Sequence, residues 1–240
     1  MEYYYTPGKN VDAEKNNLVI DDFEFKHLTK VLRKRTGDSI TVTDGERNIY
    51  HCKITSIDKD KLACDILSKE YDLYEPKARV TLYLSPLRNA SRFEFAVEKA
   101  VELGVTAIKP LISEFTLNKV MLSSTKMERI NKIIIGAMGQ SQRCVLPSFQ
   151  NAVTFNEMIG IEKEQKNKIV MYEMSEDTTE LKFNGGTDVS LLIGPEGGFS
   201  KGEIDLLKKN NWQVRSLGSR KLRAETAAVV SVFDIISKLK

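Results

Sequence analysis

Residues Leu191-Leu-Ile-Gly-Pro-Glu-Gly-Gly-Phe-Ser200 form an apolar run that is followed by a glycine-rich loop. The run predicts a buried strand, and Gly194-Pro195 predicts the turn that ends it. Ser200 with Glu203 fits a capping box, which places the start of a helix at residue 201. Because α/β proteins bind ligands where a strand gives way to a helix N-terminus, the stretch predicts a ligand-binding loop. An ordinary tight turn between a strand and a helix fits the same residues.

The composition is that of a globular chain. Its 240 residues are 41% hydrophobic and 29% charged, which is enough for one large or two small domains with a buried core. No run of about eighteen apolar residues could span a bilayer and no secretory leader stands at the start, so we expect a cytoplasmic protein that does not enter a membrane. Three widely spaced cysteines favour neither a disulfide framework nor a zinc site, and no cluster of candidate ligands predicts a bound metal.

Residues 1–70 are predicted to form a small, mainly β domain. Short strands are expected over 39–43, 48–55 and 61–67. Their close spacing is typical of a small barrel. A short helix precedes them, and Lys26-His-Leu-Thr-Lys-Val-Leu-Arg-Lys-Arg35 places five basic residues in ten positions there. Such a cluster suits phosphate contacts, although a solvated helix face has the same composition. The polar segment 69–77 is the predicted linker.

From residue 78 to 240 strands alternate with helices, which predicts a largely parallel sheet covered on both faces. The expected strands are 79–84, 105–110, 168–172, 189–193 and 214–217, and the expected helices are 91–103, 121–139, 201–209 and a C-terminal helix. A capping box of Ser91 with Glu94 is expected to open the first helix. The inward face of the last helix is predicted to consist of Ala227, Val230, Phe233 and Ile236. Since parallel strands end at one edge of the sheet, the loops after Tyr172, Ile193 and Leu217 are expected to meet there.

The predicted crevice lacks the standard motifs for nucleotide binding and for nucleophilic catalysis. The loop 194–198 is not the G-x-G-x-x-G dinucleotide fingerprint, and no Gly-Lys-Ser/Thr follows it as in a P-loop. The two histidines, His27 and His51, lie in the first domain, which excludes a histidine-centred triad in the second. The crevice offers apolar side chains, backbone groups and the charged residues Arg220, Lys221, Arg223 and Glu225. This set suits an adenine-bearing cofactor whose reactive group is already activated, so that the protein mainly positions it.

Two motifs of the second domain are more specific as a pair than singly. They are Ile193-Gly-Pro-Glu-Gly-Gly-Phe-Ser200 and Leu217-Gly-Ser-Arg-Lys-Leu-Arg-Ala-Glu-Thr-Ala227. The pair resembles the signature of the RsmE family, the 16S ribosomal RNA uracil-N3 methyltransferases of the SPOUT superfamily. Weaker blocks that resemble the same family occur in the matching order at His27-Leu-Thr-Lys-Val-Leu-Arg33, Glu98-Lys-Ala-Val-Glu-Leu-Gly-Val105 and Gln140-Ser-Gln-Arg143. The resemblance covers nearly the whole chain.

This resemblance implies an α/β fold with a C-terminal SPOUT trefoil knot on a mainly parallel sheet, and a small N-terminal PUA-like β-barrel that binds RNA. It implies S-adenosylmethionine as cofactor and N3 of a uridine in the 16S ribosomal RNA of the small ribosomal subunit as target. It also implies a homodimer whose RNA site is shared between the barrel of one chain and the knot of the other. The cofactor-binding residues implied are Met171, Tyr172, Glu173, Ile193, Gly194, Pro195, Glu196, Gly197, Gly198, Leu217, Gly218, Leu222, Arg223, Thr226 and Ala227.

The chain departs from the family pattern at a few positions. Phe115 stands where the family usually has a basic residue, and Gly139 stands where it usually has a glutamate. Ala224 replaces the usual threonine before Glu-Thr-Ala, and Arg88 occupies a position where lysine is common. These changes concern the expected RNA surface more than the cofactor pocket.

Methylation of uracil N3 requires loss of the N3–H proton, because the neutral imide nitrogen is a poor nucleophile. The expected catalytic residues are Arg223, which would stabilise negative charge on O2 or O4 of the base, and Glu225, which would take the proton or position Arg223. A structural role for Glu225 at the start of the last helix is the alternative. The expected RNA contacts are Lys30, Arg33, Lys34, Arg35, Arg88 and Arg143.

Two other functions are weighed against this one. A ribosome-assembly factor that binds RNA could keep the fold without methyltransferase activity, but the intact glycine loop and Leu222-Arg-Ala-Glu-Thr-Ala227 count against it. A nucleotide-dependent oxidoreductase is the second alternative, and the missing dinucleotide fingerprint counts against that one.

Overall fold

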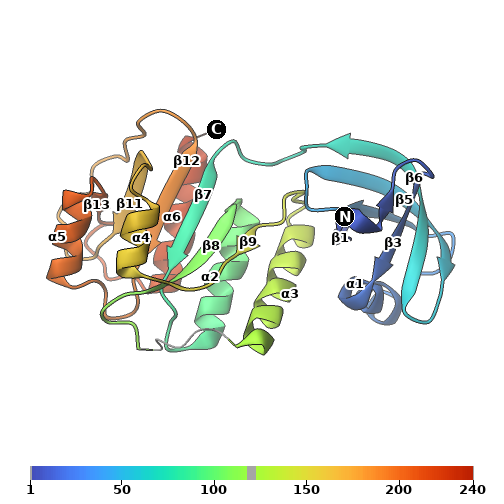
Figure 1. Cartoon of the computed structure of the whole chain (residues 1–240), viewed down its shortest axis with the longest axis horizontal. Coiled ribbons are helices and arrows are strands. Elements are labelled where there is room, and N and C mark those ends of the chain that lie inside the picture. Colours follow the sequence, from blue (N-terminus) through green and yellow to red (C-terminus); the bar gives the residue numbers. More distant parts are fainter. Residues whose placement is uncertain (1, 118–122, 240) are drawn as a thin grey trace. The chain divides into compact units, whose positions relative to one another are not determined.

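The computed structural model describes residues 2–117 and 123–239. The chain divides into two compact units, Met1–Glu75 with Ile134–Leu146, and Pro76–Ile133 with Pro147–Lys240 (Figure 1). The segment 134–146 therefore packs with the first unit, although in sequence it lies inside the predicted second domain. In the described ranges, no helix combines the length and the apolar character needed to cross a membrane.

The first unit is built on a six-stranded sheet with the strand order β1-β4-β5-β6-β3-β2. Its strands are β1 (Tyr3–Tyr5), β2 (Val11–Asp12), β3 (Asn17–Asp21), β4 (Ser39–Thr43), β5 (Asn48–Ile57) and β6 (Lys61–Tyr71). β1 pairs with β4 in parallel, and the other neighbours are antiparallel. The sequence predicted β4, β5 and β6, in which every second side chain tends to face the core, but it did not predict β1, β2 and β3. Buried side chains such as Ile40, Val42, Leu62 and Cys64 form that core.

Short helical segments complete the first unit. They are η1 (Gly8–Asn10), α1 (Asp22–Lys26) and the π-helical turn η2 (His27–Val31). The last two confirm the short basic helix that the sequence predicts, and its residues Phe25 and Leu28 are buried in the core.

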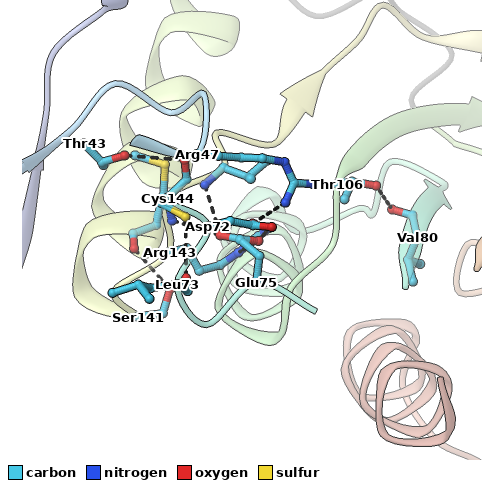
Figure 2. A network of polar contacts seen from close by, with 12 residues as sticks. Thr43, Arg47, Asp72, Leu73, Glu75, Val80, Thr106, Ser141, Arg143 and Cys144 are labelled. Carbon is cyan, nitrogen blue, oxygen red and sulfur yellow. Dashed lines mark hydrogen bonds and ion pairs between the residues drawn. The ribbon is translucent and has the colours of Figure 1, made fainter. Parts of the chain in front are cut away.

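The predicted linker 69–77 is partly wrong, because β6 continues to Tyr71 and the following residues are anchored (Figure 2). The carboxylate of Glu75 accepts hydrogen bonds from Nη2 and Nε of Arg143 at 2.8 and 3.2 Å. Its other oxygen accepts from the backbone N–H groups of Cys144 and Val145 at 2.9 and 3.0 Å. These bonds attach the segment 134–146 to the first unit, and Glu75 is thus a structural residue.

The second unit contains a seven-stranded sheet with the order β10-β8-β7-β12-β11-β13, in which β9 also pairs with β8. All of its strand pairs are parallel, as predicted. The strands are β7 (Arg79–Leu84), β8 (Ala107–Ile112), β9 (Ser148–Phe149), β10 (Val153–Thr154), β11 (Asn167–Met171), β12 (Asp188–Ile193) and β13 (Gln213–Arg215). The helices that follow β7 are α2 (Ala90–Leu103), α3 (Ser124–Gln140), α4 (Phe155–Ile161), α5 (Lys201–Lys209) and α6 (Ala224–Lys238). The part of α3 from Ile134 onward belongs to the first unit.

Helices cover the sheet of the second unit with apolar side chains. α4 and α5 pack on it through a cluster that includes Phe155, Met158, Ile204 and Leu207. α2 and α6 pack against each other, and α6 also contacts β7 and β12 (Figure 1). The helix over 201–209 is confirmed, including its capping box. Residues 121 and 122 of the predicted helix 121–139 lie outside the described residues.

Two details of the helices differ from the prediction. Asn89, and not Ser91, caps α2, since its side chain accepts a hydrogen bond from the backbone N–H of Ser91 at 2.9 Å. On α6 the predicted inward face is wrong, because Val230 and Phe233 are 42% and 60% exposed. The buried residues of α6 are Glu225, Ala228, Ser231, Val232 and Ile235. Apolar residues occur on two sides of this helix, so periodicity alone did not select the side that packs.

Candidate cofactor site

Three strands of the second unit end side by side. Met171 at the end of β11 is paired with Ile193 on β12 and with Arg215 on β13. Because the strands are parallel, the three loops that follow them leave the same edge of the sheet, which is where open α/β sheets bind ligands.

These three loops and the first turn of α6 enclose a pocket of about 390 Å³. The lining residues predicted from the sequence are Met171, Tyr172, Glu173, Ile193, Gly194, Pro195, Glu196, Gly198, Leu217, Gly218, Leu222, Arg223 and Ala227. The charged residues Arg220 and Lys221, expected in the crevice, also line it. Phe199, Ser216 and Ala224 line it in addition, and each is a direct neighbour in sequence of a predicted residue. That contiguity is the signal by which they could have been found.

The glycine loop after β12 is shaped by close packing and by a left-handed backbone. A Cβ atom on Gly194 would lie 2.9 Å from the buried ring of Phe199, so a larger residue does not fit. Gly198 has φ +70°, a conformation that costs other residues free energy. At the end of the loop, Ser200 Oγ accepts from Glu203 N at 3.3 Å, and the Glu203 carboxylate accepts from Ser200 N at 3.0 Å. The loop is thereby fixed at both ends.

Polar contacts tie the loops around the pocket to one another. Lys221 Nζ donates to Glu173 Oε1 at 3.0 Å, which joins the loops after β11 and β13. Asp177 in the loop after β11 pairs with Arg215, and hydrogen bonds from Thr179 and Arg215 lower the pKa of the Asp177 carboxyl. The backbone N–H of Arg88 donates to Glu196 Oε1 at 2.9 Å, which ties the tip of the glycine loop to the loop after β7.

The residues present fit an adenosine-like cofactor that carries charged groups. Ile193, Leu217, Leu222 and Ala227 supply apolar walls, and the glycines leave backbone groups accessible. The rim carries both carboxylates and cations, which suits a zwitterionic amino-acid tail and a positive reactive centre. Within the residues that the structure describes, no group of three or more potential metal-ligating side chains is found.

Three of the predicted site residues do not line the pocket. Gly197 is not a lining residue, and a Cβ atom added to it would lie 3.0 Å from Cβ of Phe115. Thr226 is exposed on the first turn of α6. Glu225 is only 9% exposed, and its Oε1 lies 3.6 Å from Nε of Arg92 on α2. The carboxylate thus faces α2, an arrangement that is compatible with the structural alternative drawn from the sequence.

The basic residues predicted to contact RNA fall into two groups. Lys30, Arg33, Arg35 and Arg88 are exposed, and Lys34 is half-buried. Arg143 is 3% exposed and bonded to Glu75, so the prediction that it contacts phosphate is wrong. Burial in an ion pair removes its charge from the surface.

Comparison with known proteins defines the class of this fold and site. Residues 74–235 match the model of an RNA methyltransferase domain, and residues 20–67 match that of an RNA methyltransferase PUA domain. The first match covers the pocket, and the second covers most of the six-stranded sheet with α1 and η2. The fold and the site are those of an RNA methyltransferase with an N-terminal PUA domain.

Similarity to individual proteins narrows the class. The chain is 32% identical to the ribosomal RNA small subunit methyltransferase E of Aquifex aeolicus, over 92% of this chain and 94% of that one. It is 28% identical to the enzyme of that name from Rickettsia conorii, over 93% and 91% of the two chains. The crystal structure of a ribosomal RNA small subunit methyltransferase E from Neisseria gonorrhoeae bound to S-adenosyl methionine superimposes with a TM-score of 0.86, at 27% identity and over 97% and 95% of the chains. The chain belongs to the family of ribosomal RNA small subunit methyltransferase E, as the resemblance implied.

Proposed function

We propose that this enzyme, an S-adenosylmethionine-dependent ribosomal RNA methyltransferase, methylates N3 of a uridine in the 16S ribosomal RNA of the small subunit. The observation that supports this most directly is the pocket at the ends of β11, β12 and β13, which gathers thirteen of the fifteen predicted cofactor residues. The related enzyme from Neisseria gonorrhoeae binds S-adenosyl methionine. The trefoil knot of the resemblance is part of the proposal.

The cofactor supplies a methyl group on a positively charged sulfonium, and the chain positions it. Ile193, Leu217 and Leu222 would hold the apolar parts of the cofactor, while Glu196 and Glu173, which is paired with Lys221, would offer negative charge to its cationic groups. These loops exclude water from one side of the reacting atoms. Positioning of this kind lowers the barrier because both partners have already lost their freedom of motion.

Arg223 is the proposed catalytic residue. It lines the pocket, it is exposed, and it immediately precedes α6 as the N-cap residue. Its guanidinium stabilises the negative charge that develops on O2 or O4 of uracil as the N3–H proton leaves. Glu225 fixes the first turn of α6 through Arg92 and so positions Arg223. In this proposal Glu225 is not the general base, and the N3–H proton passes to solvent water.

The RNA surface of the proposal is the basic helical segment of the first unit. Lys30, Arg33, Lys34 and Arg35 contact phosphates, which positions the RNA without reading its sequence. Because ribosomal RNA is the substrate, the cytoplasm is the proposed site of action.

The proposed homodimer uses the outer face of α6. Val230 and Phe233 on α6 are 42% and 60% exposed, and Phe95 on the adjacent α2 is 46% exposed. Exposed apolar side chains that gather on one face mark protein interfaces. Phe233→Arg should convert a dimer to a monomer in light scattering, while Phe23→Arg on the first unit should not. An unchanged mass of the Phe233 variant contradicts this interface.

The function is tested with purified enzyme, S-adenosylmethionine and 16S ribosomal RNA from cells that lack this gene. Nucleoside mass spectrometry should detect 3-methyluridine in the product. Methylation of another atom or base contradicts the proposed target but leaves the enzyme class intact. Cofactor binding without any methyl transfer, on free RNA and on small subunits alike, contradicts the function itself.

A further inference from the structure

Two aromatic rings are stacked at the surface of the first unit. The rings of Phe23 and His27 have centroids 6.3 Å apart and planes 25° from parallel. His27 also meets the ring of Tyr4 edge-on, with centroids 6.2 Å apart. Exposure rises from 7% for Tyr4 to 40% for Phe23. The row of rings thus begins in the core and presents a supported, partly exposed ring to solvent.

The helical segment that carries these rings exposes more apolar surface than its core contacts use. α1 passes at His27 into the π-helical turn η2, and the backbone N–H of Leu32 donates to the carbonyl of His27 at 3.0 Å. This turn keeps Leu28 fully buried but leaves Val31 68% and Leu32 39% exposed. π-helical turns are rare and frequently occur at functional sites. The exposed apolar side chains of Val31 and Leu32 are therefore available to contact a binding partner.

Cations flank the stacked rings. Lys26 follows Phe23 by three residues and Lys30 follows His27 by three, a spacing that makes each pair neighbours on a helix surface. Arg33 comes next, with a left-handed backbone at φ +54°. All three cations are exposed, and in the part of the chain that the structure describes none of them forms an ion pair with a carboxylate. Their charge is available to a polyanion.

We propose that Phe23 and His27 form a stacking platform for one unpaired base of the RNA, while Lys26, Lys30 and Arg33 contact the phosphates beside it. The combination of an exposed ring with unneutralised cations is how proteins bind single-stranded nucleic acid, because every base has a face that stacks. A protein partner would need acidic groups to match the cations, whereas RNA supplies both the charge and the flat surface. The platform rests on the proposed function, since it specifies how the first unit binds the RNA substrate.

The test measures binding of the full-length protein to a single-stranded dodecamer of uridines with 2-aminopurine at one position. Fluorescence of 2-aminopurine reports stacking on a ring directly. Phe23→Leu keeps the apolar bulk but removes the ring, and it should lower the affinity about 5- to 100-fold at every salt concentration. The slope of log K against log salt should stay unchanged, because no charge is lost, and Phe23→Trp should restore the affinity. Lys30→Gln should instead reduce the slope by about 0.7.

Tyr71→Leu is the matched control. It removes a ring of the same unit that is 64% exposed but lies at the end of β6, outside the helical segment that carries Lys26, Lys30 and Arg33. Its RNA affinity should equal that of the unchanged protein. If Phe23→Leu binds RNA as tightly as the unchanged protein does, the platform is overturned. Equal losses of RNA affinity in Phe23→Leu and Tyr71→Leu overturn it as well. Loss of binding to small-subunit proteins with RNA affinity intact would assign the rings to a protein partner and overturn it as well.

The outcomes also separate this proposal from the proposed function. If the unchanged protein methylates 16S ribosomal RNA while Phe23→Leu binds the dodecamer normally, only the platform is wrong. If the unchanged protein neither binds the dodecamer nor methylates ribosomal RNA, the proposed function is wrong.

Discussion

Glu75 and Arg143, 68 residues apart in sequence, form a buried ion pair whose side chains are only 3% and 4% exposed (Figure 2). Removal of one partner leaves an uncompensated buried charge, which costs about 3–5 kcal/mol. We expect Glu75→Ala to destabilise the first unit by that amount, since the N–H groups of Cys144 and Val145 also lose their acceptor. Urea unfolding measures the loss in free energy of unfolding. Hydrogen exchange of the amides in β5 and β6 assigns that loss to the first unit.

The exposed pair of Arg79 and Asp188 provides the control for this prediction. Arg79 also donates two hydrogen bonds to its carboxylate partner, one of them from Nη2 to Oδ2 at 2.8 Å. The two side chains, however, are 64% and 48% exposed. Asp188→Ala should therefore change the stability far less than Glu75→Ala does. Similar losses in both variants would show that burial does not set the contribution of the Glu75 pair.

Gly194→Ala tests the close packing of the glycine loop. The added Cβ atom would lie 2.9 Å from the ring of Phe199, which is 4% exposed and packs near Phe155. Because the ring cannot move without disturbing the core, the loop shifts and we expect roughly tenfold weaker binding of S-adenosylmethionine. Calorimetric titration measures the affinity. Gly160→Ala on α4, where the added atom meets nothing within 4 Å, should leave it unchanged.

Sequence periodicity predicted most elements because it reports which residues share a face. The strand Arg79–Leu84 and the helix Lys201–Lys209 begin and end where the sequence places them. Periodicity does not report which face a tertiary partner will cover. On α6 the predicted stripe through Val230 and Phe233 and the buried stripe through Ala228, Val232 and Ile235 differ by about one or two residues, or roughly 100–200° around the helix.

The site was predictable to the extent that it is contiguous in sequence. Each of the three loops follows a strand, so the loops could be located from the strand ends, while their individual residues came from the family resemblance. Contacts between distant segments were not visible. Arg143 is buried in its ion pair with Glu75, and a Cβ atom on Gly197 would meet Phe115. A charged residue and a glycine carry no local signal of such partners.

Glu24 in α1 should make the stability of the first unit depend on pH. Burial, and secondarily the charge of Glu2, raise the pKa of this carboxyl to about 7 from its usual 4.5. The folded state therefore binds the proton more tightly than the unfolded state, and stability falls as pH rises between those values, by up to about 3 kcal/mol. His27, whose Nδ1 lies 3.9 Å from Glu24 Oε2, and Tyr4 are the other titratable groups that face it.

Glu24→Gln isolates this effect, because the amide stays neutral at every pH. Denaturant unfolding at pH 5, 6, 7 and 8 should give a difference between variant and unchanged protein that grows in favour of the variant as pH rises. A constant difference would mean that Glu24 ionises at its usual pH in the folded state.

Arg223→Lys tests the charge-stabilising role of the guanidinium. Lysine keeps the positive charge but cannot present two parallel N–H donors to a uracil oxygen. At saturating S-adenosylmethionine we expect the single-turnover rate of methyl transfer to fall roughly 100-fold, as for loss of an oxyanion donor. An unchanged rate would contradict the role, and a loss of cofactor affinity alone would limit Arg223 to binding.

Glu225→Gln decides between a general base and a positioning residue. The carboxylate is 9% exposed and faces Arg92, with 3.6 Å between Oε1 and Nε. If it only positions the first turn of α6, the amide can still accept a hydrogen bond from Arg92, and the single-turnover rate should stay within about threefold, since less than about 1 kcal/mol is lost. Its pH profile should keep the same shape. If Glu225 were the general base, the single-turnover rate would fall roughly 100-fold or more, and the pH profile would lose the limb that reports its ionisation.

Arg92→Met is the companion variant, because it should slow methyl transfer if Arg92 holds Glu225 in place and leave the rate unchanged if Glu225 acts on the substrate alone.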